Sequence, residues 1–442
     1  MSLPDIQDHP GGYLYVQCTQ SICFDKLHTT LMVKCLKVSA FLKFIIFNFI
    51  QMKAITRTVW ILSLVSLFTD MASEMLYPVM PLFLKQIGYS AVFIGVLEGV
   101  AEAVAGLSKS YFGKRSDASG KRLPFVQLGY TFSAISKPML AIFIYPWWIF
   151  FSRTIDRMGK GIRTGARDAM LSDESIPETK GTVFGFHRSM DTMGAVFGPA
   201  IALAWLYFNP EKYQTLFIIA FAPGLIAILS TFFIKEIRKP LTQKKEIAKA
   251  RLFAFTSYWK DSPHDYKKLM TGLLLFALFN SSDVFLLLKM KETGLNDTAV
   301  IGIYIFYNLV YALLAYPVGM LADRIGLKPI FLAGLFVFVF TYIGFAFNKN
   351  VYIFILLFAM YGLYAAATEG ISKAWISNMV PKNETATAIG TYTGFQSICA
   401  LIASSLCGVL WFSFGATVTF TVTAVVTLVA LIYLATVTFL KR

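Results

Sequence analysis

Ionisable side chains stand inside long apolar segments of this sequence. Asp70 and Glu74 lie one helical turn apart, and His187 and Asp191 repeat that spacing, so each pair would share a helix face. A charge at the centre of a bilayer costs about 2.5–3.5 kcal/mol, so such residues normally face a cavity or an opposite charge. A carboxylate that loses a cationic partner in a poorly hydrated site takes up a proton. The proton-coupling candidates are Asp70, Glu74, Asp191 and Glu369.

Residues 153–167 add a stripe of cations at helical spacing. Arg153, Arg157, Lys160 and Arg163 recur every three or four residues, on one face of a helix. The deeper members would pair with Asp70 and Glu74 or bind an anion. The candidates for substrate binding or charge pairing are Arg153, Asp156, Arg157, Lys160, Asp283 and Lys373.

Simpler interpretations of these charges remain open. Asp156 with Lys160, and Glu369 with Lys373, have the spacing of neutralising pairs within one helix. Arg163 and Arg167 are expected at the cytoplasmic interface. His187 is either a titrating group or, as is commoner for a lone histidine in a membrane helix, a hydrogen-bonded packing residue.

The segments that must position these residues are long and apolar. The chain has 442 residues, of which 56% are hydrophobic and 15% charged, whereas soluble domains carry about 45–50% and about 25%. A membrane-spanning helix needs about 20 mostly apolar residues, which predicts an all-α polytopic membrane protein with about twelve transmembrane helices. The predicted spans are 59–84, 92–112, 123–145, 146–167, 183–208, 216–234, 269–288, 300–322, 329–347, 351–375, 388–412 and 417–440.

The net charge of +15 is distributed as in a membrane protein. Lysine and arginine gather in alternate connections, including residues 109–122, 235–268 and 324–328. Cytoplasmic loops carry such an excess of Lys and Arg, so both termini are expected in the cytoplasm. This distribution argues against nucleic acid as a partner and for the lipid bilayer.

The chain divides into four parts. Residues 1–52 are an N-terminal extension, interfacial or not translated, because Met52 looks like a natural start. Residues 53–234 and 269–442 form two six-helix halves with pseudo-symmetry. Residues 235–268 are a basic cytoplasmic linker, whose segment 244–259 is either a surface helix on anionic lipid or a solvated chain.

The two halves repeat each other. Several landmarks recur 206 residues later, namely Gly113, Asp117 and Gly120 as Gly319, Asp323 and Gly326. The two loops, GKRSDASGKR and GMLADRIGLK, share the pattern G-x3-D-x2-G-x-[RK]. This pattern resembles the cytoplasmic signature of the major facilitator superfamily. The segments DRMGKGIRTGARDA and YGLYAAATEGISKA are similar to a poorly characterised prokaryotic branch related to drug/proton antiporters.

The resemblance implies a gating role for the repeated loops. Asp117 and Asp323 can cap helix ends, their neighbouring glycines permit tight turns, and Arg122 holds its loop on the cytoplasmic side. A further motif, Gly194, Gly198 and Pro199, resembles the helix-5 motif of proton-driven exporters. Its glycines four apart would equally serve plain helix packing.

Together these features predict a monomeric secondary transporter of the cytoplasmic (inner) membrane. The leading hypothesis is proton-coupled efflux of a small organic molecule by rocker-switch alternating access. The alternative is uptake or exchange of a small anionic metabolite along the cationic stripe; a non-transporting membrane receptor is a third reading. The sequence shows no phosphate loop, nucleophile motif or metal-spaced histidines, so we expect no enzyme, cofactor or metal.

Overall fold

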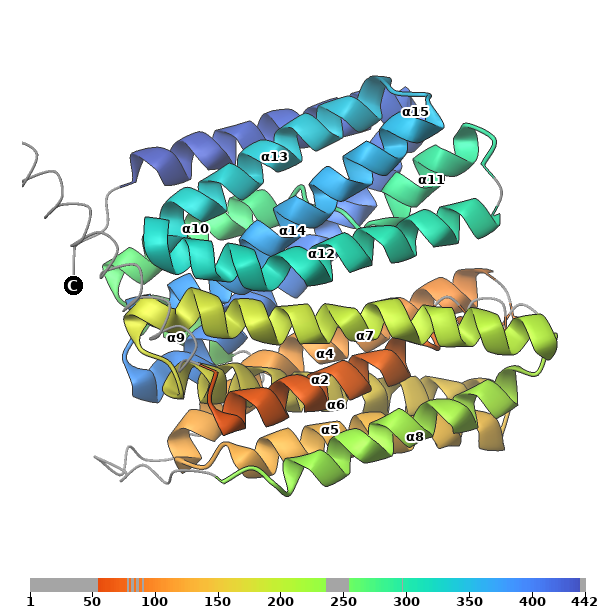
Figure 1. Cartoon of the computed structure of the whole chain (residues 1–442), viewed down its shortest axis with the longest axis horizontal. Helices are drawn as coiled ribbons and strands as arrows, with labels where there is room; N and C mark the ends of the chain where they lie inside the picture. The colour runs from red at the N-terminus through yellow and green to blue at the C-terminus, as the bar shows by residue number, and fades with distance from the viewer. Residues whose placement is uncertain are drawn as a thin grey trace, which may run out of the picture. The chain divides into compact units, whose positions relative to one another are not determined.

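The computed structural model describes residues 55–77, 79–80, 83–84, 87–89, 91–235, 254–295 and 297–437. Every long regular element within these ranges is an α-helix (Figure 1). The first set of helices is α2 Arg57–Glu74, α4 Ala91–Ser119, α5 Leu123–Ile142, α6 Pro146–Asp173, α7 Lys180–Phe208 and α8 Tyr213–Thr231. The second set is α10 His264–Ala277, α11 Val284–Glu292, α12 Asp297–Ile325, α13 Leu327–Phe347, α14 Val351–Met379 and α15 Thr385–Thr436.

Some elements of the two sets resemble each other in length and order. α4 and α12 each hold 29 residues, and the short 3-10 helices Pro177–Thr179 and Lys382–Glu384 precede α7 and α15. The turns that follow α4 and α12 hold Gly120 at φ 63° and Gly326 at φ 116°. This left-handed region favours glycine, because a side chain there would meet the backbone. The repeated glycines are therefore required by the turns.

Helix packing joins the two sets along two seams. α7 packs against α12, and α4 packs against the first part of α15. Figure 1 shows α7 and α12 running side by side, with α2, α5, α6 and α8 on one side and α13 and α14 on the other. Within the first set, α6 packs against both α4 and α5 and so carries its side chains into the middle of that set.

Several predicted boundaries differ from the structure. The expected continuous span 59–84 ends as a helix at Glu74, where the sequence holds two prolines within the next seven residues; proline removes a backbone donor and blocks helix continuation. The expected span 269–288 breaks between α10 and α11 at the polar run 280–283. Polar side chains there compete with the helix for backbone hydrogen bonds. The Ser404 hydroxyl accepts a hydrogen bond from the Ser282 amide at 3.2 Å.

The predicted boundary between the last two spans is close to the observed one. α15 is continuous in hydrogen bonding but turns at Gly415, whose φ is 79°. Six stretches of the described chain are long and apolar enough to cross a membrane by length and composition. They are Pro177–Phe208, Tyr213–Thr231, Gly302–Ile325, Leu327–Phe347, Val351–Met379 and Lys382–Thr436.

Only the C-terminal part of the predicted linker lies among the described residues. The extension 1–52 and residues 236–253 lie outside the part of the chain that the structure describes. The helix α9, Ala254–Asp261, packs against α4 and α15. Its Tyr258 hydroxyl donates to Glu384 Oε2 at 3.2 Å, so this segment is held against protein.

Candidate functional site

The cationic stripe of α6 is buried along most of its length. Arg153, Arg163 and Arg167 are only 5%, 3% and 6% exposed. Arg163 and Arg167 are therefore covered by neighbouring helices, and their position at the cytoplasmic interface stays a prediction. Glycines of α6 explain the burial: an added Cβ at Gly159 would stand 2.6 Å from the backbone oxygen of Gly129 in α5. The helices that approach so closely cover the stripe.

Asp156 is neutralised by a neighbouring helix. The Lys137 ammonium of α5 donates to Asp156 Oδ1 at 2.7 Å, and Arg153 Nη1 lies 3.9 Å from Oδ2. The expected Asp156–Lys160 pair is wrong, because Lys160 points to an exposed part of the helix whereas Lys137 is 2% exposed. Burying a charge without a partner is costly, so the buried Lys137 pairs with Asp156.

The carboxylates of α2 face the cations of α6, as predicted. Asp70 Oδ1 lies 3.9 Å from Arg163 Nη2, and the Asp70 side chain keeps 25% of its surface exposed. The cations that act most strongly on Glu74 are Lys160 and Arg157. Within the described part of the chain, the structure gives Glu74 no direct hydrogen bond or ion pair. Both carboxylates therefore remain accessible compared with Asp156.

The helix-5 motif packs α7 directly onto the carboxylate helix. An added Cβ at Gly194 would stand 2.4 Å from the backbone oxygen of Leu67 and 3.0 Å from Asp70 Cβ. At Gly198 it would stand 2.7 Å from the oxygen of Met71 and 3.0 Å from Glu74 Cβ. The motif therefore has a packing role, and its packing sets the position of both carboxylates.

Gly194→Leu is expected to destabilise the protein by about 1–3 kcal/mol, because the added atoms force α2 and α7 apart. The measurement is thermal unfolding of purified protein in detergent. The matched control is Gly302→Leu, a helical glycine whose added Cβ meets nothing within 4 Å. Equal unfolding midpoints for the two variants would contradict the packing role.

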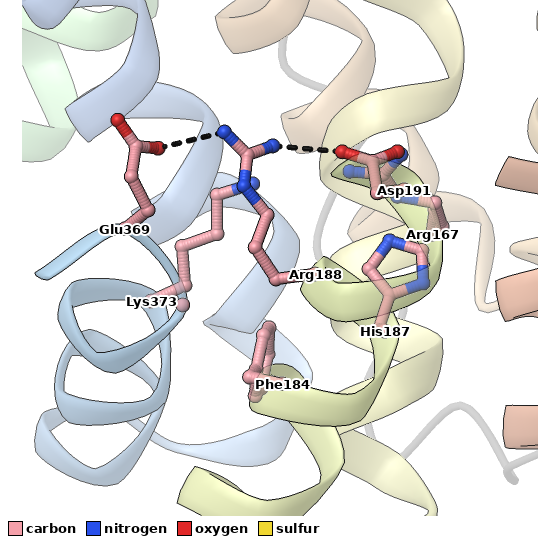
Figure 2. Close-up of a pocket in the computed structure, with 8 residues that line it drawn as sticks. Arg167, Phe184, His187, Arg188, Asp191, Glu369 and Lys373 are labelled. Carbon is pink, nitrogen blue, oxygen red and sulfur yellow. Dashed lines mark hydrogen bonds and ion pairs between the residues drawn. The ribbon is translucent and has the colours of Figure 1, made fainter. Parts of the chain in front are cut away.

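Charged residues also join the two sets of helices. Lys373 Nζ of α14 lies 2.8 Å from Asp168 Oδ2 of α6, and Arg167 Nη2 lies 2.9 Å from Asp168 Oδ1. Figure 2 shows the Arg188 guanidinium between two carboxylates, with Asp191 Oδ2 at 2.7 Å and Glu369 Oε2 at 3.1 Å. The expected Glu369–Lys373 pair is thus absent in this conformation, because each partner contacts a residue of α6 or α7.

The sequence analysis did not single out Asp168, whose side chain is fully buried in the structure. The available signal was an acidic residue at the end of the cationic stripe, directly after Arg167. Lys137 was missed in the same way, as a lone lysine within an apolar span. Each has a partner on another helix, Lys373 for Asp168 and Asp156 for Lys137, so periodicity within one helix does not reveal that contact.

A small pocket lies between the sets at this network. Its lining comprises Arg167, Phe184, His187, Arg188, Asp191, Glu369, Gly370 and Lys373. His187 is 4% exposed, and its Nδ1 lies 3.4 Å from the Ser63 hydroxyl, a geometry typical of a packing histidine. The Ser66 hydroxyl donates to Asp191, which ties α2 to the same network.

The two signature loops make equivalent contacts across the seams. Asp117 Oδ2 accepts the Thr387 amide and hydroxyl, both at 2.7 Å, at the start of α15. Asp323 accepts the amides of Gly181 and Thr182 at 2.7 and 2.6 Å, at the start of α7. Each carboxylate therefore caps a helix of the other set, where the exposed amides favour negative charge. We call this end of the helices the signature end.

Neighbouring residues support this closure. Arg122 Nη1 lies 3.3 Å from Asp117 Oδ1, and its Nε lies 3.0 Å from Asp173 Oδ2. An added Cβ at Gly319 would stand 2.3 Å from the oxygen of Gly181, and one at Gly113 would stand 2.6 Å from the oxygen of Ala386. The glycines of the motif thus let the backbones of the two sets touch at the signature end.

Asp283 lies in a different setting, at the break between α10 and α11. The Tyr361 hydroxyl of α14 donates to Asp283 Oδ1 at 2.7 Å, and the Tyr361 ring lies 5.0 Å from that of Tyr307. Asn280 donates to the Tyr364 hydroxyl at 3.1 Å. Around the break between α10 and α11, Asp283 and Asn280 are thus held by tyrosines of α14. No group of three metal-ligating side chains occurs among the described residues.

Comparisons with known proteins identify the family. The sequence profile of the Major Facilitator Superfamily matches residues 62–306 and 269–442. An uncharacterised MFS-type transporter of Methanocaldococcus jannaschii is 32% identical over 81% of this chain and 89% of its own length. A multi-drug resistance efflux pump of Streptococcus pneumoniae is 23% identical over 71% and 79% of the two chains. The crystal structure of the human organic anion transporter MFSD10 superposes with a TM-score of 0.72 at 16% identity, covering 86% and 99%. This chain belongs to the major facilitator superfamily, whose members are membrane transporters and not enzymes.

Proposed function

We propose that this protein is a proton-coupled exporter of a small organic molecule, working by rocker-switch alternating access. The observation that carries the proposal is the pair of α2 carboxylates, Asp70 and Glu74, which face the cations of α6; Asp70 Oδ1 lies 3.9 Å from Arg163 Nη2 and its side chain is 25% exposed. We propose that the rocking motion of the two sets moves these carboxylates relative to their cations. A carboxylate that loses a cation in a poorly hydrated site takes up a proton, which is the coupling step that such a cycle needs.

The architecture that we propose has twelve membrane-spanning helices in two similar halves, residues 53–234 and 269–442. The equal lengths of α4 and α12 and the left-handed glycines at equivalent turns support it. The basic residues near the signature end support a cytoplasmic location for that end, and we propose that both chain termini lie on the same side. The prokaryotic relatives indicate the inner membrane, and the helices of one chain complete the charge network, so we propose a monomer.

Two features favour export of an organic molecule over the alternative. One relative is a multi-drug efflux pump. In addition, Arg153, Arg163 and Arg167 each lie within 4 Å of a carboxylate, so much of the cationic stripe is already neutralised. The alternative, uptake or exchange of an anionic metabolite, is favoured by the likeness to an organic anion transporter. That likeness, at 16% identity, extends to the fold alone.

Flux in proteoliposomes with an imposed pH gradient distinguishes these functions. With an acidic lumen, which represents an acidic exterior, accumulation of a fluorescent hydrophobic cation such as ethidium supports proton-driven export. One pH unit sustains at most about a tenfold accumulation per exchanged proton in electroneutral exchange. Accumulation of fluorescein, an organic anion, in response to the opposite gradient would instead establish the alternative. Flux of neither probe, nor of any compound that raises the unfolding temperature, would indicate a receptor without transport activity.

A further inference from the structure

Six charged side chains of alternating sign form a ring, open at one point, beside the pocket of Figure 2, which five of them line. In order around the ring they are Lys373, Asp168, Arg167, Asp191, Arg188 and Glu369. Glu369 and Lys373, at the two ends of this series, stand one turn apart on α14 and make no ion pair with each other in this conformation. The ring crosses between the two sets at the contacts Lys373–Asp168, 2.8 Å, and Arg188–Glu369, 3.1 Å.

The ring divides into two neutral parts at these crossings. The four members on α6 and α7 are two cations and two carboxylates, and they remain in contact: Arg167 with Asp168 at 2.9 Å, and Arg188 with Asp191 at 2.7 Å. The two members on α14 are one cation and one carboxylate at i and i+4, a spacing at which helical neighbours pair. When the sets separate, every charge therefore retains an opposite charge on its own side.

We propose that Asp168 and Lys373, together with Arg188 and Glu369, form a proton-independent latch that holds the signature end closed. On opening, the two inter-set ion pairs are replaced by the Glu369–Lys373 pair within α14. Asp168 acts by holding Lys373 and is a positioning residue. The Asp168 side chain is 0% exposed, so water cannot replace a lost ion partner there. Each charge of the latch therefore needs a partner in both conformations.

This latch rests on the proposed function and makes it more specific. It assigns the coupling proton to carboxylates that lie outside the latch. Asp191 and Glu369 keep cationic partners throughout the exchange and stay ionised. Asp70 and Glu74 lie outside the ring. The groups that face them are Arg157, Lys160 and Arg163 of α6, Lys137 of α5, Asp191 of α7 and Tyr304 of α12. The carboxylate that loses and gains a proton in the cycle is thus on α2.

A distance measurement across the signature end tests the latch without knowledge of the substrate. Glu178 and Asn383 are exposed, occupy equivalent turns of the two sets, and accept spin labels on introduced cysteines in a cysteine-free chain. Double electron–electron resonance in lipid nanodiscs then reports opening. Asp168→Asn and Lys373→Gln are each expected to raise the open fraction roughly tenfold, because each removes the buried Lys373–Asp168 contact that joins the two sets. Asp168→Asn with Lys373→Gln should exceed neither alone, since both remove the same contact.

The pH dependence of the same distance separates the latch from the proton site. Acidification is expected to shift the open fraction of the unmodified protein, of Asp168→Asn and of Glu369→Gln. The shift should be lost in Asp70→Asn with Glu74→Gln. An open fraction unchanged by Asp168→Asn, Lys373→Gln and Glu369→Gln would overturn the latch. Loss of the pH response in Glu369→Gln, with retention in the α2 variant, would place the proton on the ring and overturn it as well. If neither the unmodified protein nor any variant responds to pH, while the latch variants still raise the open fraction, the result supports the latch and contradicts proton coupling.

Discussion

Asp70→Asn combined with Glu74→Gln is expected to abolish accumulation driven by a pH gradient while leaving substrate exchange intact. Neither amide can release a proton, so both mimic the protonated state permanently. The two carboxylates face the α6 cations, and Asp70 keeps 25% of its side chain exposed, so protons can reach it. At one pH unit the unmodified protein should approach about a tenfold accumulation, and the variant should stay at onefold. The measurement is proteoliposome flux of the substrate identified by thermal-shift screening.

The control for this prediction is Glu178→Gln, which neutralises an exposed carboxylate at the signature end. It should leave both accumulation and exchange unchanged. The single variants reveal which carboxylate carries the proton, because only its loss removes the pH response. If the double variant still accumulates substrate against a gradient, the proton site lies elsewhere, and Asp191 and Glu369 become the candidates.

The sequence predicted the elements better than the contacts between them. Apolar segments of about 20 residues identified most of the helices, because their length and composition are set by the bilayer. Breaks in two predicted spans were missed, since an apolar average hides the polar run 280–283. The repeat of Asp117 as Asp323 indicated equivalent roles. Their partners Thr387 and Gly181 lie on helices that the repeat alone does not place beside them.

Charge pairing was the weakest prediction, for a physical reason. A spacing of four residues shows which side chains can meet on one helix, but a helix packed on its neighbours offers competing partners. Asp156 pairs with Lys137 of α5 and not with Lys160, because Lys137 has no access to water. Lys373 pairs with Asp168 of α6 and not with Glu369. If the latch is correct, the predicted Glu369–Lys373 pair describes the other conformation of the cycle.

Asp117→Ala with Asp323→Ala is expected to open the signature end more than either substitution alone. Each carboxylate accepts two hydrogen bonds from the start of a helix in the other set, at 2.6–2.7 Å. Hydrogen bonds to a charged group contribute about 1.5–3 kcal/mol each. The two sites lie on separate seams and share no partner, so their effects should add to within about 0.5 kcal/mol. Loss of both should therefore make the closed conformation the minor one.

The resonance distance between labels at residues 178 and 383 measures this population directly. Asp261→Ala, which removes an exposed carboxylate of α9, is the control and should not change it. Asp117→Asn and Asp323→Asn refine the result, because the amide oxygen still accepts a hydrogen bond but carries no charge. An intermediate open fraction for the asparagine variants shows that charge contributes beyond hydrogen bonding, as expected for a carboxylate at a helix start. A double alanine variant that opens no more than the single ones would contradict two independent caps, and would mean that one seam alone holds the sets together.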